Sequence, residues 1–219
     1  MNINDVELQD YDSNVDRLEA IFNKQKMLYN RYGVIEEAKG IGHGILNQGV
    51  FNIDDARSQY LVKDFCWRVT EELAEAAEAF SDQHYEHGRE ELADAFHFLV
   101  ELCIIVGISH KDFTLAPKNR LSAIYKRYCA IPVDRLTTSN ADLMWGVTVE
   151  LGLAANCLKN KPWKQTQMET DEKKFIRRVK GAFIAFIVVC DFNGMGPDEL
   201  FETYFKKSEV NKFRIRSEY

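Results

Sequence analysis

The chain has 219 residues, of which 46% are apolar and 12% aromatic, which is enough to bury the core of one large domain or two small ones. Its 28 Lys and Arg residues are outnumbered by 34 Asp and Glu residues, giving a formal net charge of -6. This balance argues against a general binding surface for long nucleic acids, although it is compatible with a small polyanion that is held through metal ions.

The cysteines and the apolar runs indicate a cytoplasmic protein. The cysteine count is odd and no Cys-x-x-Cys pair occurs, so neither a disulfide framework nor a zinc site is expected. The N-terminal segment is polar and acidic, and the longest apolar runs, 96–108 and 182–190, are too short to span a bilayer. We therefore expect a reducing compartment and no membrane partner. The five cysteines are Cys66, Cys103, Cys129, Cys157 and Cys190.

The first third of the chain is predicted to begin with a helix. Only four prolines occur, and apolar residues recur mainly at three- and four-residue spacing, which favours an all-α fold. A cap at Ser13 or Asn14 predicts a first helix that ends at about Tyr32, before Gly33. Residues 33–51 are rich in glycine and are expected to form a flexible loop.

Two long helices are predicted next. One follows Asp54 and Asp55 and reaches about Phe80. The other extends from about Tyr85 to Gly107 and is apolar on nearly all sides after Leu92, which is typical of a buried helix. We expect this helix to lie at the centre of the fold.

The C-terminal half is also predicted to be helical. A connection marked by Pro117 and Pro132 leads to a cap within 138–140 and a helix to about Leu158. Another helix is expected over 171–190, and after a turn at 193–197 a final amphipathic helix extends from Asp198 to about Lys212. No domain boundary is evident, so residues 1–219 are predicted to form a single domain.

Two acidic pairs are the strongest chemical signal. Glu72 and Glu75 are three residues apart on one predicted helix, and Glu91 and Asp94 have the same spacing on the next. This spacing places both carboxylates of a pair on one helix face. Two such faces predict a cluster of four carboxylates.

Carboxylates on apolar helices repel one another, so they persist mainly where cations or basic side chains neutralise them. Oxygen ligands suit Mg²⁺, which binds protein carboxylates and substrate phosphates together. From spacing alone, a solvated acidic face and a structural ion-pair network are the alternatives to a metal site.

These residues resemble the dimeric dUTPases and, more broadly, the MazG-like all-α NTP pyrophosphatases. The signature is Glu-x-x-Glu followed on the next helix by Glu-x-x-Asp, and residues 90–98, Glu-Glu-Leu-Ala-Asp-Ala-Phe-His-Phe, are similar to the dimeric dUTPase version. The resemblance implies a helical bundle of the all-α NTP pyrophosphatase type and a homodimer. It also implies Mg²⁺, with Mn²⁺ as a possible substitute, and hydrolysis of dUTP to dUMP and diphosphate. We expect Glu72 or Glu75 to accept the proton of the attacking water.

A second match lies near the C-terminus, where Tyr204-x-x-Lys207-x-x-x-Asn211-x-x-Arg214 and the closing Tyr219 resemble the family's C-terminal segment. The resemblance implies that Lys207 and Arg214 hold the phosphates and that Asn211 lies at the nucleotide. Gln25 corresponds to a first-helix glutamine that looks like part of the family's nucleotide pocket. On its own, a core glutamine with satisfied hydrogen bonds is an equal alternative. A polar helix end with solvated basic residues is the alternative interpretation of this segment.

The chain also departs from the family pattern. Only 15 residues (76–90) separate Glu75 from Glu91, and a Trp-Lys element occurs late, in residues 156–164. These departures leave the base open, with dCTP as the rival of dUTP. The sequence also leaves open whether the diphosphate dUDP is cleaved.

Two other classes of protein remain as alternatives. A di-iron carboxylate bundle needs two Glu-x-x-His motifs, and only Asp94-Ala-Phe-His97 approaches one; we expect His97 to be a core residue rather than a ligand. A non-catalytic helical interaction protein needs no metal at all. The basic C-terminal segment 206–216 favours phosphate chemistry over both.

Overall fold

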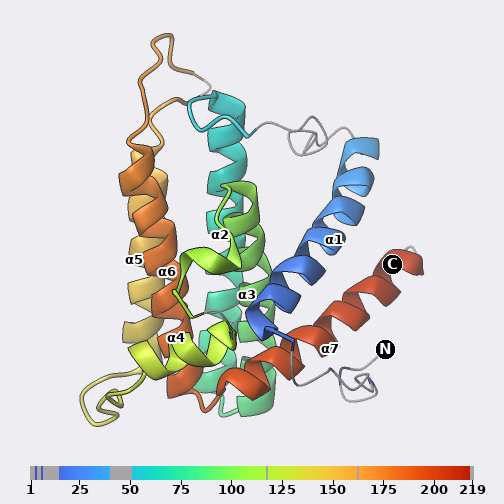
Figure 1. Cartoon of the computed structure of the whole chain (residues 1–219), viewed down its shortest axis with the longest axis vertical. Helices are drawn as coiled ribbons and strands as arrows, with labels where there is room; N and C mark the ends of the chain where they lie inside the picture. Colours follow the sequence, from blue (N-terminus) through green and yellow to red (C-terminus); the bar gives the residue numbers. More distant parts are fainter. Residues whose placement is uncertain are drawn as a thin grey trace.

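The computed structural model describes residues 3, 6, 15–39, 51–116, 118–161 and 163–217. Regular structure in these residues is entirely helical, as the all-α prediction requires (Figure 1). The α-helices are α1 (Arg17–Ala38), α2 (Ala56–Ser81), α3 (Tyr85–Ile105), α4 (Arg120–Tyr128), α5 (Asn140–Cys157), α6 (Glu172–Phe192) and α7 (Pro197–Arg216), and a short 3₁₀ helix, η2, covers His110–Asp112.

The predicted bounds of the first helix are wrong at both ends. Asp16 is the N-cap, and its Oδ1 accepts a hydrogen bond from the backbone N–H of Glu19 at 3.1 Å. The proposed caps Ser13 and Asn14 lie outside the described residues. At the other end α1 continues through the buried Gly33 to Ala38. A single glycine costs a helix only about 1 kcal/mol and need not end it. The glycines at 40–49 lie outside the described residues.

The connection between the third and fifth helices contains a helix that the sequence analysis missed. The prolines at its ends suggested a loop, but α4 buries Leu121, Ile124 and Tyr125 on one face. The hydroxyl of Tyr125 donates a hydrogen bond to the backbone oxygen of Met195 at 2.9 Å. The remaining helices agree with the prediction to within a few residues, and α7 is longer than expected at its C-terminal end.

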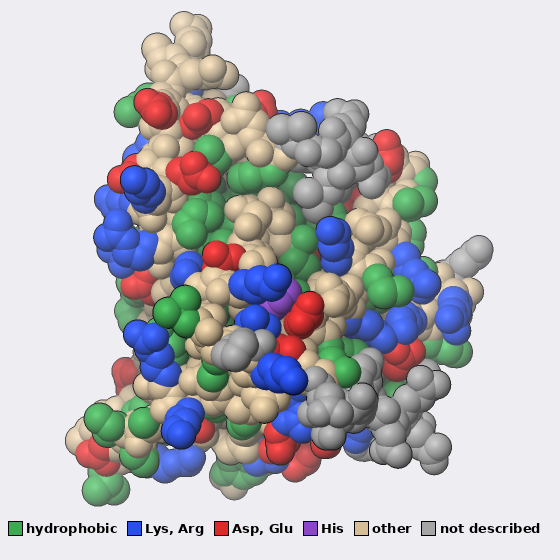
Figure 2. Space-filling view, viewed as in Figure 1, with side chains coloured by type: hydrophobic (Ala, Val, Ile, Leu, Met, Phe, Trp, Pro, Cys, Tyr) green, Lys and Arg blue, Asp and Glu red, His purple; other side chains and the backbone are tan. Residues whose placement is uncertain are grey.

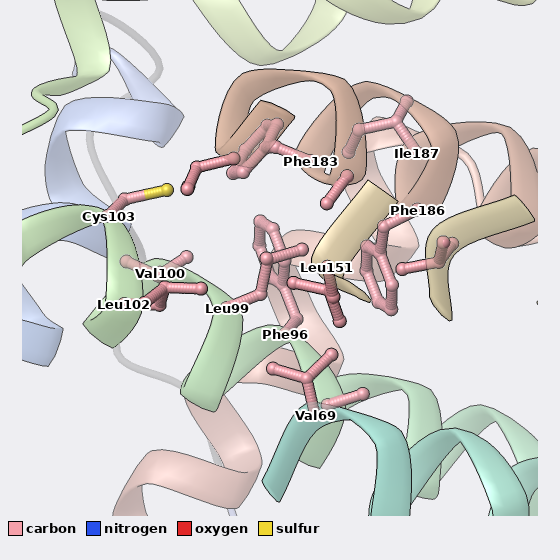
Figure 3. Packing of buried hydrophobic residues seen from close by; sticks show 14 of the residues in the cluster. Val69, Phe96, Leu99, Val100, Leu102, Cys103, Leu151, Phe183, Phe186 and Ile187 are labelled. Atoms are coloured by element: carbon pink, nitrogen blue, oxygen red, sulfur yellow. The ribbon is translucent and has the colours of Figure 1, made fainter. Parts of the chain in front are cut away.

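Helices α2, α3, α5 and α6 share the apolar core. Figure 3 shows Phe96 of α3 beside Phe183 and Phe186 of α6, with ring centroids 5.5 and 5.4 Å apart, and with Val69 of α2 and Leu151 of α5 completing the cluster. All five side chains are at most 1% exposed. Each helix is therefore fixed by packing that it cannot achieve alone.

Helices α1 and α7 lie on the other side of α2 and α3 from the α5/α6 pair (Figure 1). Both pack against α3, which is buried on most sides, as predicted. None of the helices in the described part of the chain has the length and apolar character needed to cross a membrane. The arrangement leaves the acidic segments of α2 and α3 facing α1 and α7.

Candidate active site

Helices α2 and α3 bring three of the predicted metal ligands together. Oxygen atoms of Glu72, Glu91 and Asp94 all lie within 4.8 Å of one another. Buried Leu73 and Leu92, next in sequence to two of the acids, anchor the helices in the core. The apolar stripe of each helix thus fixes where its carboxylates meet.

The electrostatics of this acidic triplet are unfavourable without a cation. Burial, together with the charges of Asp94, Glu75 and Glu91, raises the pKa of Glu72 to about 8. Burial also raises the pKa values of Glu91 and Asp94, against the opposing effect of Lys207. Each carboxylate is therefore harder to ionise than in water.

The fourth predicted ligand, Glu75, lies at the edge of the cluster. Its side chain is exposed and is not part of the triplet, although its charge contributes to the raised pKa of each of the other three acids. It follows Glu72 by one turn on α2. The predicted set of four is thus a compact triplet with one outer carboxylate.

His87 and Lys207 are the basic side chains that contact the triplet in the described part of the chain, and Nδ1 of His87 lies 3.2 Å from Oε1 of Glu91. Nζ of the buried Lys207 lies 2.5 Å from Oδ2 of Asp94. One ammonium group does not balance three carboxylates, so negative charge remains at the cluster. The donor set consists of oxygen atoms alone, which fits a hard divalent cation and contains no histidine of the kind that a di-iron site needs.

A pocket of about 370 Å³ opens beside the triplet and contains most of the predicted substrate-binding residues. Gln25, Glu72, Asp94, Asn211 and Arg214 line it. It also has lining residues that were not assigned to the site from sequence. These are Leu28, Tyr32, Glu36, Arg68, His97, Phe98 and Glu101.

The inner end of the pocket is a buried polar network around Gln25. Its Oε1 accepts hydrogen bonds from the Tyr204 hydroxyl and from Nδ1 of His97, both at 2.7 Å, and its Nε2 donates to Glu101 at 3.2 Å. Burial lowers the pKa of His97 to about 3, which leaves the ring neutral, and the ring stacks on Tyr204 with centroids 4.0 Å apart. His97 is thus buried, as predicted, but it also borders the pocket.

Glu101 and Arg68 could have been found from sequence by their register. Glu101 follows His97 by one turn and Asp94 by two, so it shares their face of α3, and burial raises its pKa to about 8. Arg68 precedes Glu72 by one turn of α2. Its guanidinium lies over the rings of Phe65 and Phe98, 4.7 and 5.7 Å from their centroids.

The C-terminal helix supplies positive charge at the pocket mouth. In Figure 2, Lys and Arg side chains gather over the C-terminal half of α7. Arg214 is exposed and lines the pocket, Asn211 is half-buried and lines it too, and Arg216 is exposed and does not. Tyr219, the last residue of the predicted motif, lies outside the described residues.

A sequence model of the family described as dUTPase matches residues 17–219 of this chain. The match contains every residue predicted for the site, from Gln25 to Arg214. No curated protein and no solved structure matches the chain.

Proposed function

The chain belongs to the dUTPase family and is a hydrolase of nucleoside triphosphates, and we propose that it converts dUTP to dUMP and diphosphate in the pocket beside Glu72, Glu91 and Asp94. The observation that carries this proposal is the acidic triplet within 4.8 Å, which shares its pocket with Arg214 and faces Lys207. A triphosphate held between cations and basic side chains needs this combination.

Glu72, Glu75, Glu91 and Asp94 would hold Mg²⁺, or Mn²⁺ in its place. The bound cation would neutralise charge on the triphosphate and make the attacking water more acidic. Glu72 or Glu75, one turn apart on α2, would accept the proton of that water. Because the triplet is already assembled, little reorganisation would be required of the protein.

The remaining residues of the pocket would bind and orient the nucleotide. Arg214 offers a planar pair of donors for phosphate oxygens and Lys207 a compact charge. Gln25 and Asn211 would contact the nucleoside. Phe98 lies on the pocket wall and offers a face on which a base can stack.

The pocket chemistry is compatible with uracil, and dCTP is the alternative substrate. The raised pKa of Glu101 favours a neutral carboxyl, which carries both a donor and an acceptor. Uracil presents the complementary O4 acceptor and N3–H donor. Cytosine instead presents an amino donor and an N3 acceptor. The same carboxyl can pair with both if its O–H and C=O groups exchange places.

We further propose a cytoplasmic homodimer. All five cysteines are free thiols, which suits a reducing compartment. Trp145, Val149 and Leu153 form an exposed apolar stripe on α5, with Trp145 67% exposed. Such a stripe is typical of a surface that is covered by another chain.

The purified protein can be tested with each dNTP in turn and the products identified. We expect dUTP to give dUMP and diphosphate with Mg²⁺ or Mn²⁺, and we expect Ca²⁺ to inhibit because it accepts a looser coordination geometry. Full turnover in excess chelator would overturn the proposed metal dependence. Release of orthophosphate instead of diphosphate would overturn the proposed reaction.

A further inference from the structure

A second, larger cavity lies away from the acidic triplet, between α2 and the C-terminal end of α5. We call it the α2–α5 groove. Its volume is about 730 Å³, against about 370 Å³ for the catalytic pocket, and falls within the range of roughly 300–1,000 Å³ that is typical of small-molecule sites. Its lining includes Tyr60, Lys63, Trp67, Lys161 and Trp163.

Residues 158–161, 163 and 164 form one wall of the groove, and a buried polar network around Asn160 holds this wall in place. Asn160 is 2% exposed, and its backbone N–H donates to the side chain of Gln59 at 2.7 Å. Its Nδ2 donates to the backbone oxygens of Asp54 and Met168, and its Oδ1 accepts from the backbone N–H of Met168. Buried polar groups satisfied in this way fix one conformation, so the wall is preorganised.

Three aromatic side chains of the groove are left largely in solvent. Tyr60, Trp67 and Trp163 are 66%, 61% and 75% exposed. The indole N–H of Trp67 donates to Glu71 at 2.8 Å, which orients the ring. Exposed aromatic rings in one cavity offer stacking surfaces, and stacking of one nucleic-acid base on such a ring contributes about 1–3 kcal/mol.

The same groove carries an excess of positive charge. Lys63, Lys159, Lys161 and Lys164 all line it, and burial and the charges of the other three lysines lower the pKa of Lys63. Among the described lining residues the single acid is Asp64, whose carboxylate is paired with Arg68 at 2.8 Å. No other carboxylate among the described lining residues is present to neutralise the four lysines. Their positive charge therefore suits an anionic ligand.

We propose that the α2–α5 groove is a second binding site for a nucleoside phosphate, separate from the catalytic pocket. The base would stack on the exposed indoles, and the phosphates would contact Lys161 and Lys164. The lysine charge argues against a second copy of the chain packing groove to groove, since like charges would then face each other. The volume of the groove fits a mononucleotide.

The test uses ATP as the probe, with the intact protein in excess EDTA so that metal-dependent binding in the catalytic pocket is suppressed. Trp67 and Trp163 line the groove, so we expect ATP to quench tryptophan fluorescence saturably. The double variant Lys161→Glu/Lys164→Glu should weaken ATP binding at least about tenfold, the effect of losing one to two charge-assisted contacts. Its dUTP turnover should stay at the wild-type level, because neither residue lines the catalytic pocket.

Two controls separate this site from the catalytic one and from a general charge effect. Lys173→Glu/Lys174→Glu makes the same charge change at exposed positions of α6 and should leave ATP binding intact, as should Glu72→Gln. Adenosine and inorganic triphosphate should each bind more weakly than ATP.

The proposal is overturned if ATP does not bind at millimolar concentration, if Glu72→Gln abolishes binding, or if only an oligonucleotide binds. A change of oligomeric state in the Lys161→Glu/Lys164→Glu variant without loss of ATP binding would also overturn it and assign the groove to an interface.

Discussion

The helix pairs α2/α3 and α5/α6 share a local pattern but differ in the charges that they bury. Val-Thr-x-Glu-Leu occurs at 69–73 in α2 and again at 147–151 in α5. Thr70 donates to the backbone oxygen of Cys66 at 3.0 Å, and Thr148 donates to that of Met144 at 3.1 Å. The buried positions that correspond in the two pairs are Val69 and Val147, Leu73 and Leu151, Ala76 and Ala154, Leu92 and Val179, Ala95 and Ala182, and Phe96 and Phe183.

In this register the acids of α3 are replaced by other residues in α6. Arg178 stands where α3 has Glu91, and Gly181 stands where it has Asp94. Nη1 of Arg178 donates to both carboxylate oxygens of Glu150, at 3.0 and 3.2 Å. A Cβ at Gly181 would lie 2.9 Å from Oε2 of Glu150, so the glycine leaves room for that carboxylate.

The comparison shows two ways to neutralise a glutamate between packed helices. In α5/α6 the chain supplies its own cation, Arg178. In α2/α3 the corresponding Glu72 lies with Glu91 and Asp94. Lys207 contacts Asp94, and the exposed His87 contacts Glu91. The second arrangement leaves negative charge that an external cation can neutralise, and this makes it suitable for metal-dependent chemistry.

The largest expected effect comes from removing one acid of the triplet. Glu72→Ala and Asp94→Ala should each lower kcat/KM for dUTP at least about a thousandfold, roughly 4 kcal/mol, while circular dichroism shows a folded helical protein, because loss of one acid relieves repulsion. Glu150→Ala removes the corresponding glutamate of α5 and should leave turnover near the wild-type level. Wild-type turnover in Glu72→Ala would rule out the proposed metal ligands.

A smaller loss is expected at the basic residues of α7. Lys207→Ala and Arg214→Ala should each lower kcat/KM about thirtyfold, since a charge-assisted phosphate contact contributes about 2 kcal/mol. Arg216→Ala should have little effect, because Arg216 does not line the pocket. The measurement is steady-state kinetics on dUTP and dCTP. If Arg216→Ala is as damaging as Arg214→Ala, the assignment of the phosphate-binding residues is wrong.

The comparison between the two helix pairs can be tested by reversing the charge of Arg178. Arg178→Glu would place a second carboxylate beside Glu150, so we expect the free energy of unfolding to fall by about 1–2 kcal/mol, allowing for the partial exposure of both side chains. Mn²⁺ should restore part of that loss, as measured by urea unfolding with and without the ion. Arg177→Glu makes the same charge change at an exposed neighbour and should show neither effect. A destabilisation that Mn²⁺ leaves unchanged would contradict the comparison.

The sequence predicted the structure best where the residue pattern within a single helix was sufficient. Capping residues and three- and four-residue spacing predicted α2, α3, α5 and α6. The acidic pairs predicted a cluster of four carboxylates, of which Glu72, Glu91 and Asp94 lie together. Arg68 and Glu101 were not assigned, although Arg68 lies one turn from Glu72 and Glu101 lies two turns from Asp94 on the same helix faces. The extension of α1 past Gly33 was missed because one glycine does not necessarily end a helix. The existence of α4 was missed because the burial of its apolar face depends on tertiary packing.

The last expected effect concerns the pH dependence of stability. Burial raises the pKa of Glu101 from 4.5 to about 8, so the folded protein keeps this proton over a range in which the unfolded chain has lost it. The free energy of unfolding of the metal-free protein should therefore fall as pH rises from about 5 to 8, at a slope of at most about 1.4 kcal/mol per pH unit for this group. Glu101→Gln should flatten this part of the profile, because a neutral amide has no proton to lose. Glu72 should cause a similar loss of stability with rising pH. Addition of Mg²⁺ should offset the loss caused by Glu72 but leave the loss caused by Glu101. Urea unfolding of wild type and Glu101→Gln across this range is the measurement, and equal slopes for the two proteins would mean that Glu101 is ionised in the folded state.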